Sequence, residues 1–596
     1  MIRRLLRGRP RLPAYPLPAT APARPDLRVA VVLDPFSELA FGYEWAQVTF
    51  GPDDWQQVLE EQRPDLLVVE SAWHGNQDRW RLHMTGSTGP SQELRALVAW
   101  CRREGIPTVF WNKEDPPGYD RFLPTARLFD QVFTVDADRI PDYQRDLGHD
   151  RVELLPFAAQ PRLHNPVRRG PVRRGPVRQG PAGPRPYDVA FAGTWFADKH
   201  PERREQMEFV LEPALDHGLH IWSRWQRGGR RYRFPQPYRR AVVGSLPYEQ
   251  MLAAYTAYRV FLNVNSVTGS KTICSRRLFE LSAAQTAVVS APAASIEPFF
   301  GRAVTVVEDA GQTRAALDLL LTDDDARDRL ALQAHRRVHD EHLLSHRVDT
   351  VLRAVGLDRA VRGTAAPTVS AVVATRRPHQ LDHVLRSVGR QSHRELELVL
   401  VTHGFVPDEE ELRRRADEAG VPRVVLVPAA AELTLGACLD LGVDAAGGEL
   451  VAKMDDDNFY GTHYLTDLVR ALDYSGADVT GKWAHLVLLE ASGDTLLRFG
   501  DSEHRFVRQV QGGTLLTSAA VARRIRFQDL PRGVDTAFLA DVRAAGLTVY
   551  AADRFNFVSV RSADHAGHTW QISDDELRAR SSRLLDVADP YDLAEA

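Results

Sequence analysis

Three consecutive carboxylates, Asp455, Asp456 and Asp457, lie between an apolar strand-like run and a helix-like stretch. Adjacent like charges repel, each close pair by roughly 1–4 kcal/mol at the effective dielectric of water or a protein surface. Exposure to solvent relieves this repulsion, and so does a hard divalent cation, which prefers oxygen ligands. The sequence therefore leaves two interpretations open: an exposed helix start with Asp457 or Asn458 as N-cap, or a cation site.

Further along the chain, residue types that could complete a reaction follow in order. Gly512 and Gly513 form a turn before a helix, where a second molecule could approach the backbone. Asp535 stands at the start of another helix, which suits a general base, although a lone aspartate there is more often an N-cap. Either His565 or His568 could ligate a metal, although a lone histidine is more often a hydrogen-bonded surface residue.

The elements that must position these groups alternate between strands and helices. Residues 368–377 predict a strand that ends at Thr375 and Arg376, and a helix and a second strand follow. A third strand leads through Lys453 to the three carboxylates. Because ligands of open α/β sheets bind outside the carboxyl ends of the strands, this is the predicted binding edge.

The N-terminal part of the chain has the same rhythm. Buried strands are predicted at 27–34, 65–73 and 107–112, with helix-like stretches between them. This spacing indicates βαβ units and a parallel sheet. Polar residues directly after the strands, such as Glu70 and Lys113, could bind a ligand or simply face solvent.

A segment rich in Pro, Gly and Arg at 158–186 cannot bury a core and predicts an extended linker. The strand–helix rhythm restarts at 187–196, a strand that leads into Gly193. A small residue at such a strand end lets backbone N–H groups approach a phosphate.

A later helix start in this second region carries Ser275, Arg276 and Arg277. The helix dipole and the two guanidinium groups together suit the binding of an anion. Glu280 lies one turn further on, where its carboxylate could accept hydrogen bonds from a ribose.

A family resemblance rests on three stretches of this region: WNKEDPPGYDRF, VAFAGTWFADKHPERR and NVNSVTGSKTICSRRLFELSAAQTAVVSAP. Over about residues 27–355 the chain resembles the spore maturation protein CgeB-like group of GT-B glycosyltransferases. The resemblance implies that Glu280 holds the nucleotide ribose and that Arg276 or Arg277 holds the diphosphate. The chain departs from the pattern at Thr272, where many GT-B enzymes have a glutamate.

A second resemblance rests on TRRPHQLDHVLRSVGRQS, LGACLDLGVDAAGGELVAKMDDDNFY, GGTLL, GVDTAFL and HTW. Over about residues 368–575 the chain resembles inverting GT-A glycosyltransferases of the large polysaccharide-synthesising family. The resemblance implies that Asp455 and Asp457 form a D-x-D motif and that Asp535 deprotonates the acceptor hydroxyl. It also implies His568 as an additional ligand of Mn²⁺ or Mg²⁺.

The same resemblance places the nucleotide-sugar donor beside Thr375, Arg376, Lys453 and Asp456, and the acceptor beside the Gly512–Gly513 turn. A nucleoside diphosphate is a poor leaving group unless its developing charge is neutralised, which a cation held by carboxylates does. Lys453 could equally balance the charge of the aspartates. The chain departs from the family at 401–404, where an aspartate usually contacts the base.

Composition narrows the class of protein. The hydrophobic content of 44% and charged content of 26% are ordinary for a soluble globular protein, and the net charge of -4 argues against a general nucleic-acid binder. Cys101, Cys274 and Cys438 show neither zinc nor disulfide spacing, which fits a reducing cytoplasm. No apolar run reaches the ~18 residues of a membrane span.

Residues 1–26 are basic and lack the apolar core of a secretory signal, so we expect a disordered arm. Peripheral attachment to an anionic membrane surface is the functional alternative for this arm.

The sequence thus predicts an α/β protein with a GT-B-like pair of Rossmann domains followed by a GT-A-like nucleotide-diphospho-sugar transferase domain. The predicted divisions are the basic arm 1–26, Rossmann-like domains at 27–157 and 187–365, the linker 158–186, and the GT-A-like domain 366–596.

We expect a cytoplasmic or membrane-peripheral enzyme that moves a sugar from a nucleotide-diphospho-sugar to a glycan or a cell-wall or surface polysaccharide. The expected mechanism is metal-dependent inverting transfer in the C-terminal domain, with no nucleic-acid partner. The N-terminal module is predicted to be a second transferase or, alternatively, a non-catalytic glycan-binding or scaffolding unit.

Overall fold

A computed structural model describes residues 10–85, 89–168, 185–225, 229–363, 365–562, 573–587 and 589–596. The chain divides into two compact units. Unit 1 comprises Met1–Pro166 and Arg185–Thr364, and unit 2 comprises Val167–Pro184 and Ala365–Ala596.

Unit 1 contains two six-stranded sheets in which every paired strand is parallel. The first sheet has the strand order β2 (Trp45–Thr49), β1 (Arg24–Val32), β3 (Leu66–Glu70), β4 (Thr108–Asn112), β5 (Gln131–Thr134), β6 (Val152–Leu154). The second has the order β12 (Thr305–Val306), β11 (Ala287–Ser290), β10 (Tyr258–Asn263), β7 (Tyr187–Gly193), β8 (Leu219–Ser223), β9 (Val242–Gly244). The predicted pair of Rossmann-like sheets is confirmed.

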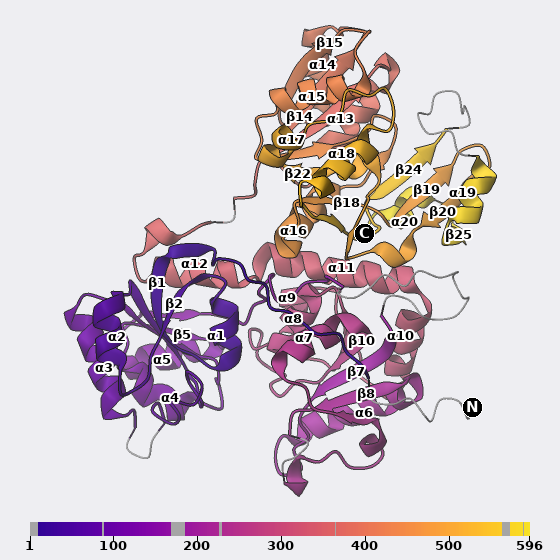
Figure 1. Cartoon of the computed structure of the whole chain (residues 1–596). Helices are drawn as coiled ribbons and strands as arrows, with labels where there is room; N and C mark the ends of the chain where they lie inside the picture. Colours follow the sequence, from indigo (N-terminus) through magenta and orange to yellow (C-terminus); the bar gives the residue numbers. More distant parts are fainter. Residues whose placement is uncertain are drawn as a thin grey trace. The chain divides into compact units, whose positions relative to one another are not determined.

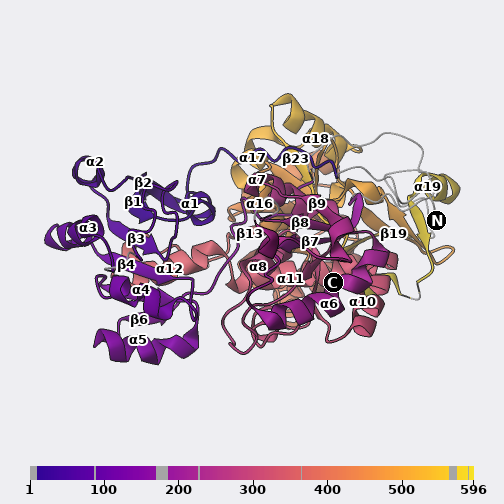
Figure 2. The ribbon, with the colours of Figure 1, turned by 90° about the horizontal axis from the view of Figure 1, so that it is seen from below.

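The helices that cover the first sheet come before β6, except one. They are α1 (Pro35–Phe41), α2 (Trp55–Gln62), α3 (Gln92–Arg103), α4 (Tyr119–Ala126) and α5 (Ile140–Leu147). The second region contributes α6 (Pro201–Ala214), α7 (Tyr248–Ala257), α8 (Arg276–Ala283), α9 (Ile296–Phe300), α10 (Ala310–Thr322) and α11 (Asp324–Glu341). The exception is α12 (Leu344–Ala354), whose apolar side chains pack in the core of the first sheet, and Figures 1 and 2 both draw it there.

Strand β1 begins at Arg24, three residues before the predicted start. Arg24 is buried because its guanidinium donates to Glu44 Oε2 at 2.7 Å and to Asp349 Oδ1 of α12 at 2.5 Å. The residues before it also contact unit 1, for example through the Tyr15 hydroxyl, which donates to the carbonyl oxygen of Leu163 at 2.5 Å. Of the predicted disordered arm, residues 1–9 lie outside the described residues.

The predicted linker also differs from the structure at its beginning. Residues 159–168 are mostly buried rather than extended into solvent, because Leu163 packs in a core of unit 1 and Val167 packs in a core of unit 2. The rest of the segment up to residue 184 lies outside the described residues.

Unit 2 contains a mixed eight-stranded sheet and a five-stranded sheet. The larger has the order β15 (Val424–Ala429), β14 (Leu396–His403), β13 (Val369–Thr375), β16 (Leu450–Lys453), β22 (Leu516–Ser518), β18 (Val479–Gly481), β23 (Val549–Ala551), β21 (Arg505–Val507). The smaller has the order β17 (Phe459–Tyr460), β24 (Phe557–Arg561), β19 (His485–Leu489), β20 (Asp494–Arg498), β25 (Arg583–Leu585). The helices are α13 (Leu381–Gly389), α14 (Glu409–Ala419), α15 (Leu435–Ala445), α16 (Tyr464–Ser475), α17 (Ala519–Ile525), α18 (Val534–Ala544), α19 (Asp574–Arg580) and α20 (Pro590–Ala594).

Strand β16 lies in the middle of the larger sheet. It pairs in parallel with β13, with Val372 opposite Lys453, and in antiparallel with β22. Its short apolar run is buried on both faces, as a central strand requires, and the chain leaves the sheet directly before the aspartates. The predicted α/β class with a GT-A-like unit after a GT-B-like unit is confirmed.

Among the described residues, no helix combines the length and the apolar character that a bilayer-spanning segment needs.

Candidate active site

The carboxyl end of β16 brings a buried ammonium group to the aspartates. Lys453 is 4% exposed, and its Nζ lies 2.7 Å from Asp455 Oδ1 and 3.1 Å from Asp535 Oδ1. It also donates to the carbonyl oxygen of Gly512 at 3.0 Å. Burial disfavours the charge of Lys453, but the two carboxylates outweigh it and raise its pKa. Lys453 therefore joins two groups that lie 80 residues apart in the sequence.

The three aspartates have different surroundings. Asp455 accepts from Asn458 Nδ2 at 3.2 Å, and its backbone N–H donates to the Tyr460 hydroxyl at 2.7 Å. Asp456 accepts from the Thr375 hydroxyl at 2.5 Å. Asp457 faces the same cavity as Asp455, whereas Asp456 turns to the side of β13. The first and third aspartates therefore face the cavity and the second does not, which matches the D-x-D spacing.

No helix begins at the aspartates. Strand β17 comes first, and α16 starts at Tyr464 with His463 as its N-cap residue. The interpretation of Asp457 or Asn458 as an N-cap is therefore wrong.

Asp535 occupies the first turn of α18, whose N-cap residue is Gly533. The aspartate is thus not the N-cap, and its negative charge lies where the helix dipole favours it. Burial, with a contribution from Asp455, raises the pKa of Asp535 against the opposing effect of Lys453.

The Gly512–Gly513 turn fits closely against these carboxylates. A Cβ on Gly512 would lie 2.1 Å from Asp535 Oδ2, and a Cβ on Gly513 would lie 2.4 Å from Asp455 Oδ2. The sequence predicts these glycines as an approach for the acceptor. The structure adds that any side chain here would collide with two of the predicted reactive groups.

One cavity of about 450 Å³ collects these groups. Asp455, Asp457 and Asp535 line it together with Gly512 and Gly513, so five of the residues predicted from separate motifs meet in one place. This volume falls in the range of small-molecule sites.

The predicted donor-binding residues lie at the end of β13. The Thr375 hydroxyl is bound to Asp456, and Arg376 Nη2 lies 3.3 Å from His403 Nε2. His403 stands in the segment where the family usually has an aspartate, and it also lies 3.1 Å from the carbonyl oxygen of Ala431.

Sequence reasoning missed Arg377. Its guanidinium donates to both oxygens of Asp456 and, at 2.8 Å, to Asp457 Oδ2. The signal was present, since two arginines follow Thr375 at a strand end, but spacing alone did not show which one would turn toward the aspartates.

Two carboxylates, those of Asp455 and Asp457, are suited to hold a metal ion. Burial and the neighbouring Asp455 raise the pKa of Asp457 although Arg377 opposes this, so negative charge here is incompletely balanced and a divalent cation would relieve it. Among the described residues, no three His, Cys, Asp or Glu side chains form a metal-holding group. His565 and His568 lie outside the described residues.

In unit 1, Glu280 of α8 is sealed inside the fold. It is 1% exposed, and its carboxylate accepts hydrogen bonds from the hydroxyls of Tyr248 at 2.9 Å and Tyr255 at 2.6 Å. Arg276 Nε lies 2.9 Å from the same carboxylate. Burial alone would raise the pKa of Glu280, but Arg276 and His164 outweigh it and lower it. A ribose could reach Glu280 only by displacing one of these partners.

His164 extends this internal network. Its Nδ1 accepts the backbone N–H of Gln160 at 3.0 Å, which assigns the proton to Nε2, and Nε2 lies 2.8 Å from the Tyr248 hydroxyl. Burial lowers the pKa of His164 to about 4.

Four arginines gather near the start of α8. Burial, together with the charge of Arg277, lowers the pKa of Arg203 to about 10. Burial and the charges of Arg276 and Arg277 also lower the pKa of Arg224. Ser275 is the N-cap residue of α8 but its side chain makes no capping hydrogen bond. The predicted anion site thus gains Arg203 and Arg224, two residues that sequence reasoning missed.

Two other predicted positions in unit 1 serve the fold directly. A Cβ on Gly193 would lie 2.7 Å from the ring of Phe191, so the glycine makes room for an aromatic neighbour. The hydroxyl of Thr272 accepts the backbone N–H of Ala137 at 2.9 Å.

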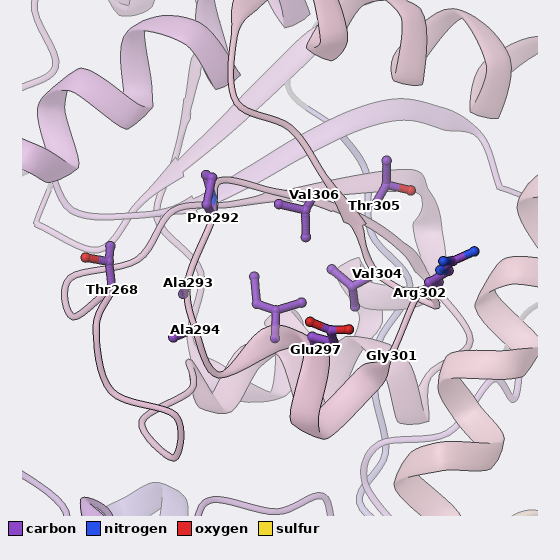
Figure 3. A pocket seen from close by; sticks show the side chains of 11 residues that line it. Thr268, Pro292, Ala293, Ala294, Glu297, Gly301, Arg302, Val304, Thr305 and Val306 are labelled. Carbon is purple, nitrogen blue, oxygen red and sulfur yellow. The ribbon is translucent and has the colours of Figure 1, made fainter. Parts of the chain in front are cut away.

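A second cavity, of about 590 Å³, lies in unit 1 beside α9 and β12 (Figure 3). Its lining is mostly apolar, with charged side chains at Glu297 and Arg302. No predicted site residue lines it.

Two family models match the chain. A family described as glycosyl transferase-like matches residues 203–353, which include Ser275 and Glu280. Glycosyl transferase family 2 matches residues 370–491, which include the three aspartates. Two separate parts of the chain thus each resemble a family of glycosyltransferases.

Solved structures resemble this chain only in part. The mannosyltransferase PcManGT from Pyrobaculum calidifontis, in complex with GDP-Man and Mn2+, is 15% identical over 37% of this chain and 66% of its own, with a TM-score of 0.27. S. aureus TarS 1-349 in complex with UDP-GlcNAc is 16% identical over 35% of this chain and 63% of its own, with a TM-score of 0.27. The chain spans less than two thirds of either structure, and TM-scores this low support no argument. Among curated proteins, none matches it.

The family 2 match ends at residue 491, before Gly512, Gly513 and Asp535. These residues lie in the turn before β22 and in α18, outside the matched part, and line the cavity of unit 2. The structure also brings in side chains that no motif indicated, above all Trp483, Phe499 and Arg561.

Proposed function

We propose that unit 2 transfers a sugar from a nucleotide-diphospho-sugar to a hydroxyl of a glycan or of a cell-wall or surface polysaccharide. The observation that carries this proposal is the meeting of Asp455, Asp457 and Asp535 in one cavity, with Lys453 between two of them. The family 2 match to the same unit supports the reaction class.

Asp455 and Asp457 would hold Mn²⁺ or Mg²⁺, with His568 as a further ligand. When bound, the cation neutralises the charge that develops on the departing diphosphate. At the end of β13, Thr375, Arg376 and Asp456 would contact the donor, and the guanidinium of Arg376 would add positive charge there.

Asp535 would act as the base. Its carboxylate takes the proton from the acceptor hydroxyl, the acceptor oxygen forms the new bond to the anomeric carbon, and the bond from that carbon to the diphosphate oxygen breaks. One in-line displacement inverts the configuration, so one base suffices. Lys453 would hold Asp535 in position, since its Nζ lies 3.1 Å from Asp535 Oδ1.

The test is to incubate the full chain with a panel of nucleotide sugars, including UDP-GlcNAc and GDP-mannose, and with Mn²⁺, Mg²⁺ or EDTA. We expect one donor to release its nucleoside diphosphate only when a metal is present, with inverted configuration at the transferred sugar. A nucleotidyltransferase, which also uses paired aspartates, would instead be identified by release of pyrophosphate from a nucleoside triphosphate that is supplied together with a sugar 1-phosphate.

For unit 1 we propose a non-catalytic glycan-binding or scaffolding module in preference to a second transferase. The burial of Glu280 favours this, because its carboxylate is enclosed by side chains of unit 1, and the Thr272 hydroxyl already accepts a backbone hydrogen bond from Ala137. The full chain carrying Asp455→Ala and Asp457→Ala separates the two: residual turnover of any donor would support a second transferase.

We also propose that the protein acts in the cytoplasm, either freely or peripherally at a membrane. Cys101, Cys274 and Cys438 are all buried and free, as expected of a chain that folds in a reducing compartment.

A further inference from the structure

The segment between β8 and β9 of unit 1 carries a concentration of positive charge that the proposed reaction does not use. Seven arginines and no acidic residue lie between Asp216 and Glu249, the arginines at positions 224, 227, 230, 231, 233, 239 and 240. The chain as a whole has a net charge of -4, so this excess is local. A surface of one sign attracts ligands of the opposite charge.

The fold brings this segment beside another loop. Strands β7 and β8 lie side by side (Figure 1) and pair in parallel up to Gly193 and Ser223. The loops that follow them, 194–200 and 224–241, therefore leave the same edge of the second sheet, the edge at which α/β folds bind ligands. The backbone N–H of Ala197 donates to the carbonyl oxygen of Arg231 at 3.0 Å, which joins the two loops directly.

Three aromatic rings contact one another across this junction. Phe196 of the first loop lies 5.9 Å from Tyr232 of the second between ring centroids, and Tyr232 lies 5.7 Å from Trp225. Trp225 is 52% exposed. Tyr232 contacts both of its neighbours, so it supports an indole that is open to solvent.

Cationic side chains lie on the same rings. Lys199 Nζ is 4.5 Å from the centroid of Phe196, and the guanidinium carbon of Arg231 is 4.8 Å from that of Tyr232. Arg231 also lies 3.6 Å from Asp198, but both side chains are at least half exposed and such a pair is weak. Positive charge therefore stays available to a partner. We call the following five residues the ring patch: Phe196, Lys199, Trp225, Arg231 and Tyr232.

Neighbouring groups confirm that the potential here is positive. Arg230 and Arg233 flank the patch in the sequence, and both side chains are exposed. Burial lowers the pKa of His200, and the charges of Lys199 and Arg203 lower it further. A second positive charge is thus unfavourable at this edge of the sheet, whereas an anion is favoured.

We propose that the ring patch binds an acidic polysaccharide, one whose sugar rings carry phosphate or carboxylate groups. The inference rests on the proposed glycan-binding role of unit 1 and names the class of glycan. The exposed indole of Trp225 suits the apolar C–H face of a sugar ring. Arg231, with Arg230 and Arg233, would bind the anionic substituents through charge-assisted hydrogen bonds.

Other partners fit the ring patch less well. An anionic bilayer also attracts arginines, but insertion into its interface needs several apolar side chains. Among the described residues of the two loops, Trp225 is the one large apolar side chain that is exposed. A neutral glycan would use this ring and leave the surrounding cations unused. Ring and charge together therefore favour the acidic polysaccharide.

The experiment measures binding of polymers to the full chain by calorimetry at physiological ionic strength. Carboxymethyl-dextran and phosphorylated dextran carry both rings and charge, dextran carries the rings alone, and poly-glutamate carries the charge alone. We expect at least one charged dextran to bind about tenfold or more tightly than dextran, and more tightly than poly-glutamate of the same charge density. The affinity should fall as salt is added, because contacts between exposed charges are screened.

Variants assign the preference to the ring patch, since other basic stretches of the chain also attract polyanions. Trp225→Ala should weaken binding of the charged dextran by about fivefold and leave that of poly-glutamate unchanged. Arg230→Gln with Arg233→Gln should weaken binding of both polyanions by about tenfold. Thermal unfolding shows that each variant is folded.

The matched control is Arg81→Gln with Arg103→Gln. Both arginines are exposed, belong to the region of the first sheet and remove the same charge when substituted. This double variant should bind the charged dextran as the wild-type chain does.

Three results would overturn the inference. The first is equal binding of charged and neutral dextran, and the second is wild-type affinity in the folded patch variants. The third is tighter binding to a single-stranded oligonucleotide, or to vesicles of phosphatidylcholine and phosphatidylglycerol in equal parts, than to either charged dextran. This third result would identify a nucleic acid or a membrane surface as the partner.

Donor turnover by the full chain that carries Asp455→Ala and Asp457→Ala tests the proposed role of unit 1 separately. Residual turnover together with a preference for charged dextran contradicts the non-catalytic role alone. No turnover together with equal binding of charged and neutral dextran contradicts the inference alone.

Discussion

The two units use buried carboxylates in opposite ways. In unit 1, Glu280 lies among Arg276, Tyr248 and Tyr255, and its charge is satisfied inside the fold. In unit 2, Asp455 and Asp535 share one ammonium group and open onto a cavity. The first arrangement stabilises a structure, whereas the second leaves negative charge for a ligand to complete.

This difference teaches that the same residue type in the same kind of fold can serve packing or chemistry. Both carboxylate sites belong to α/β units, and the sequence assigned both to ligands: Glu280 to the nucleotide ribose, and Asp455 to a metal ion beside the predicted base Asp535. Access to solvent and the number of internal partners distinguish them, and neither quantity is visible in a motif.

The largest expected effect is on catalysis in unit 2. Asp455→Ala with Asp457→Ala should lower metal-dependent release of nucleoside diphosphate by roughly 10³-fold or more, because the site loses both proposed metal ligands. The thermal unfolding midpoint should stay the same or rise, since adjacent like charges are removed. Glu410→Gln on α14, an exposed position, is the control. Unchanged turnover and metal dependence would contradict the site.

In unit 1 we expect a loss of stability rather than a loss of activity. Glu280→Gln removes the buried charge that accepts hydrogen bonds from Tyr248 and Tyr255 and pairs with the half-buried Arg276, and should destabilise unit 1 by about 2 kcal/mol. Denaturant unfolding followed by a probe in unit 1 measures this. A variant with wild-type stability would show that Glu280 is not a structural residue and would return it to the candidate ribose ligands.

A smaller loss of activity should follow from adding one methyl group. In Gly512→Ala the new Cβ would meet Asp535 Oδ2 at 2.1 Å, so the carboxylate must move. Displacement of a reacting group by about 1 Å can cost roughly 10²-fold in kcat. Gly269→Ala, whose Cβ would enter open space, should leave kcat unchanged. Equal kcat values for the two alanine variants would exclude a close role for Asp535.

The smallest effect is the pH dependence of stability in unit 1. The folded pKa of His164, about 4, lies below the ordinary value of 6.5, so the unfolded chain binds more protons between these values. Stability is therefore fully present above pH 6.5 and falls on acidification, by about 2 kcal/mol at pH 5. His164→Gln should flatten the unfolding free energy of unit 1 over this range. A wild-type protein that is equally stable at pH 5 and pH 7.5 would contradict the assignment.

Much of the fold could be predicted from the sequence. Short apolar runs separated by helix-like stretches gave β1, β3, β4, β7 and β13, because a strand buried on both faces carries a continuous apolar signal. The first and last residues of the strands were predicted less accurately. Arg24 extends β1 through ion pairs with Glu44 and Asp349, which come from distant parts of the sequence.

The reactive centre was predicted better than its walls. Asp455, Asp457, Asp535, Gly512 and Gly513 lie together as the order of motifs suggests, although their roles remain predictions. Trp483, Phe499 and Arg561 could not be foreseen, because they meet only through the pairing of β19 with β20 and β24. Glu280 was predicted to hold a nucleotide ribose. The two tyrosines that donate to its carboxylate belong to another helix, α7, and its motif does not reveal them.

The assignment of Val167 to unit 2, one residue after Pro166 of unit 1, has a practical consequence for dissecting the protein. Each unit is encoded by two separate stretches of the gene, so a fragment that starts at residue 365 lacks a valine that is 4% exposed among the side chains of β13 and β14. Three peptide connections join the two units, at 166–167, 184–185 and 364–365, and cleavage of any one would leave the others to keep their effective concentration high. An isolated C-terminal fragment should therefore be made by circular permutation or by fusing residues 165–170 to it, rather than by simple truncation.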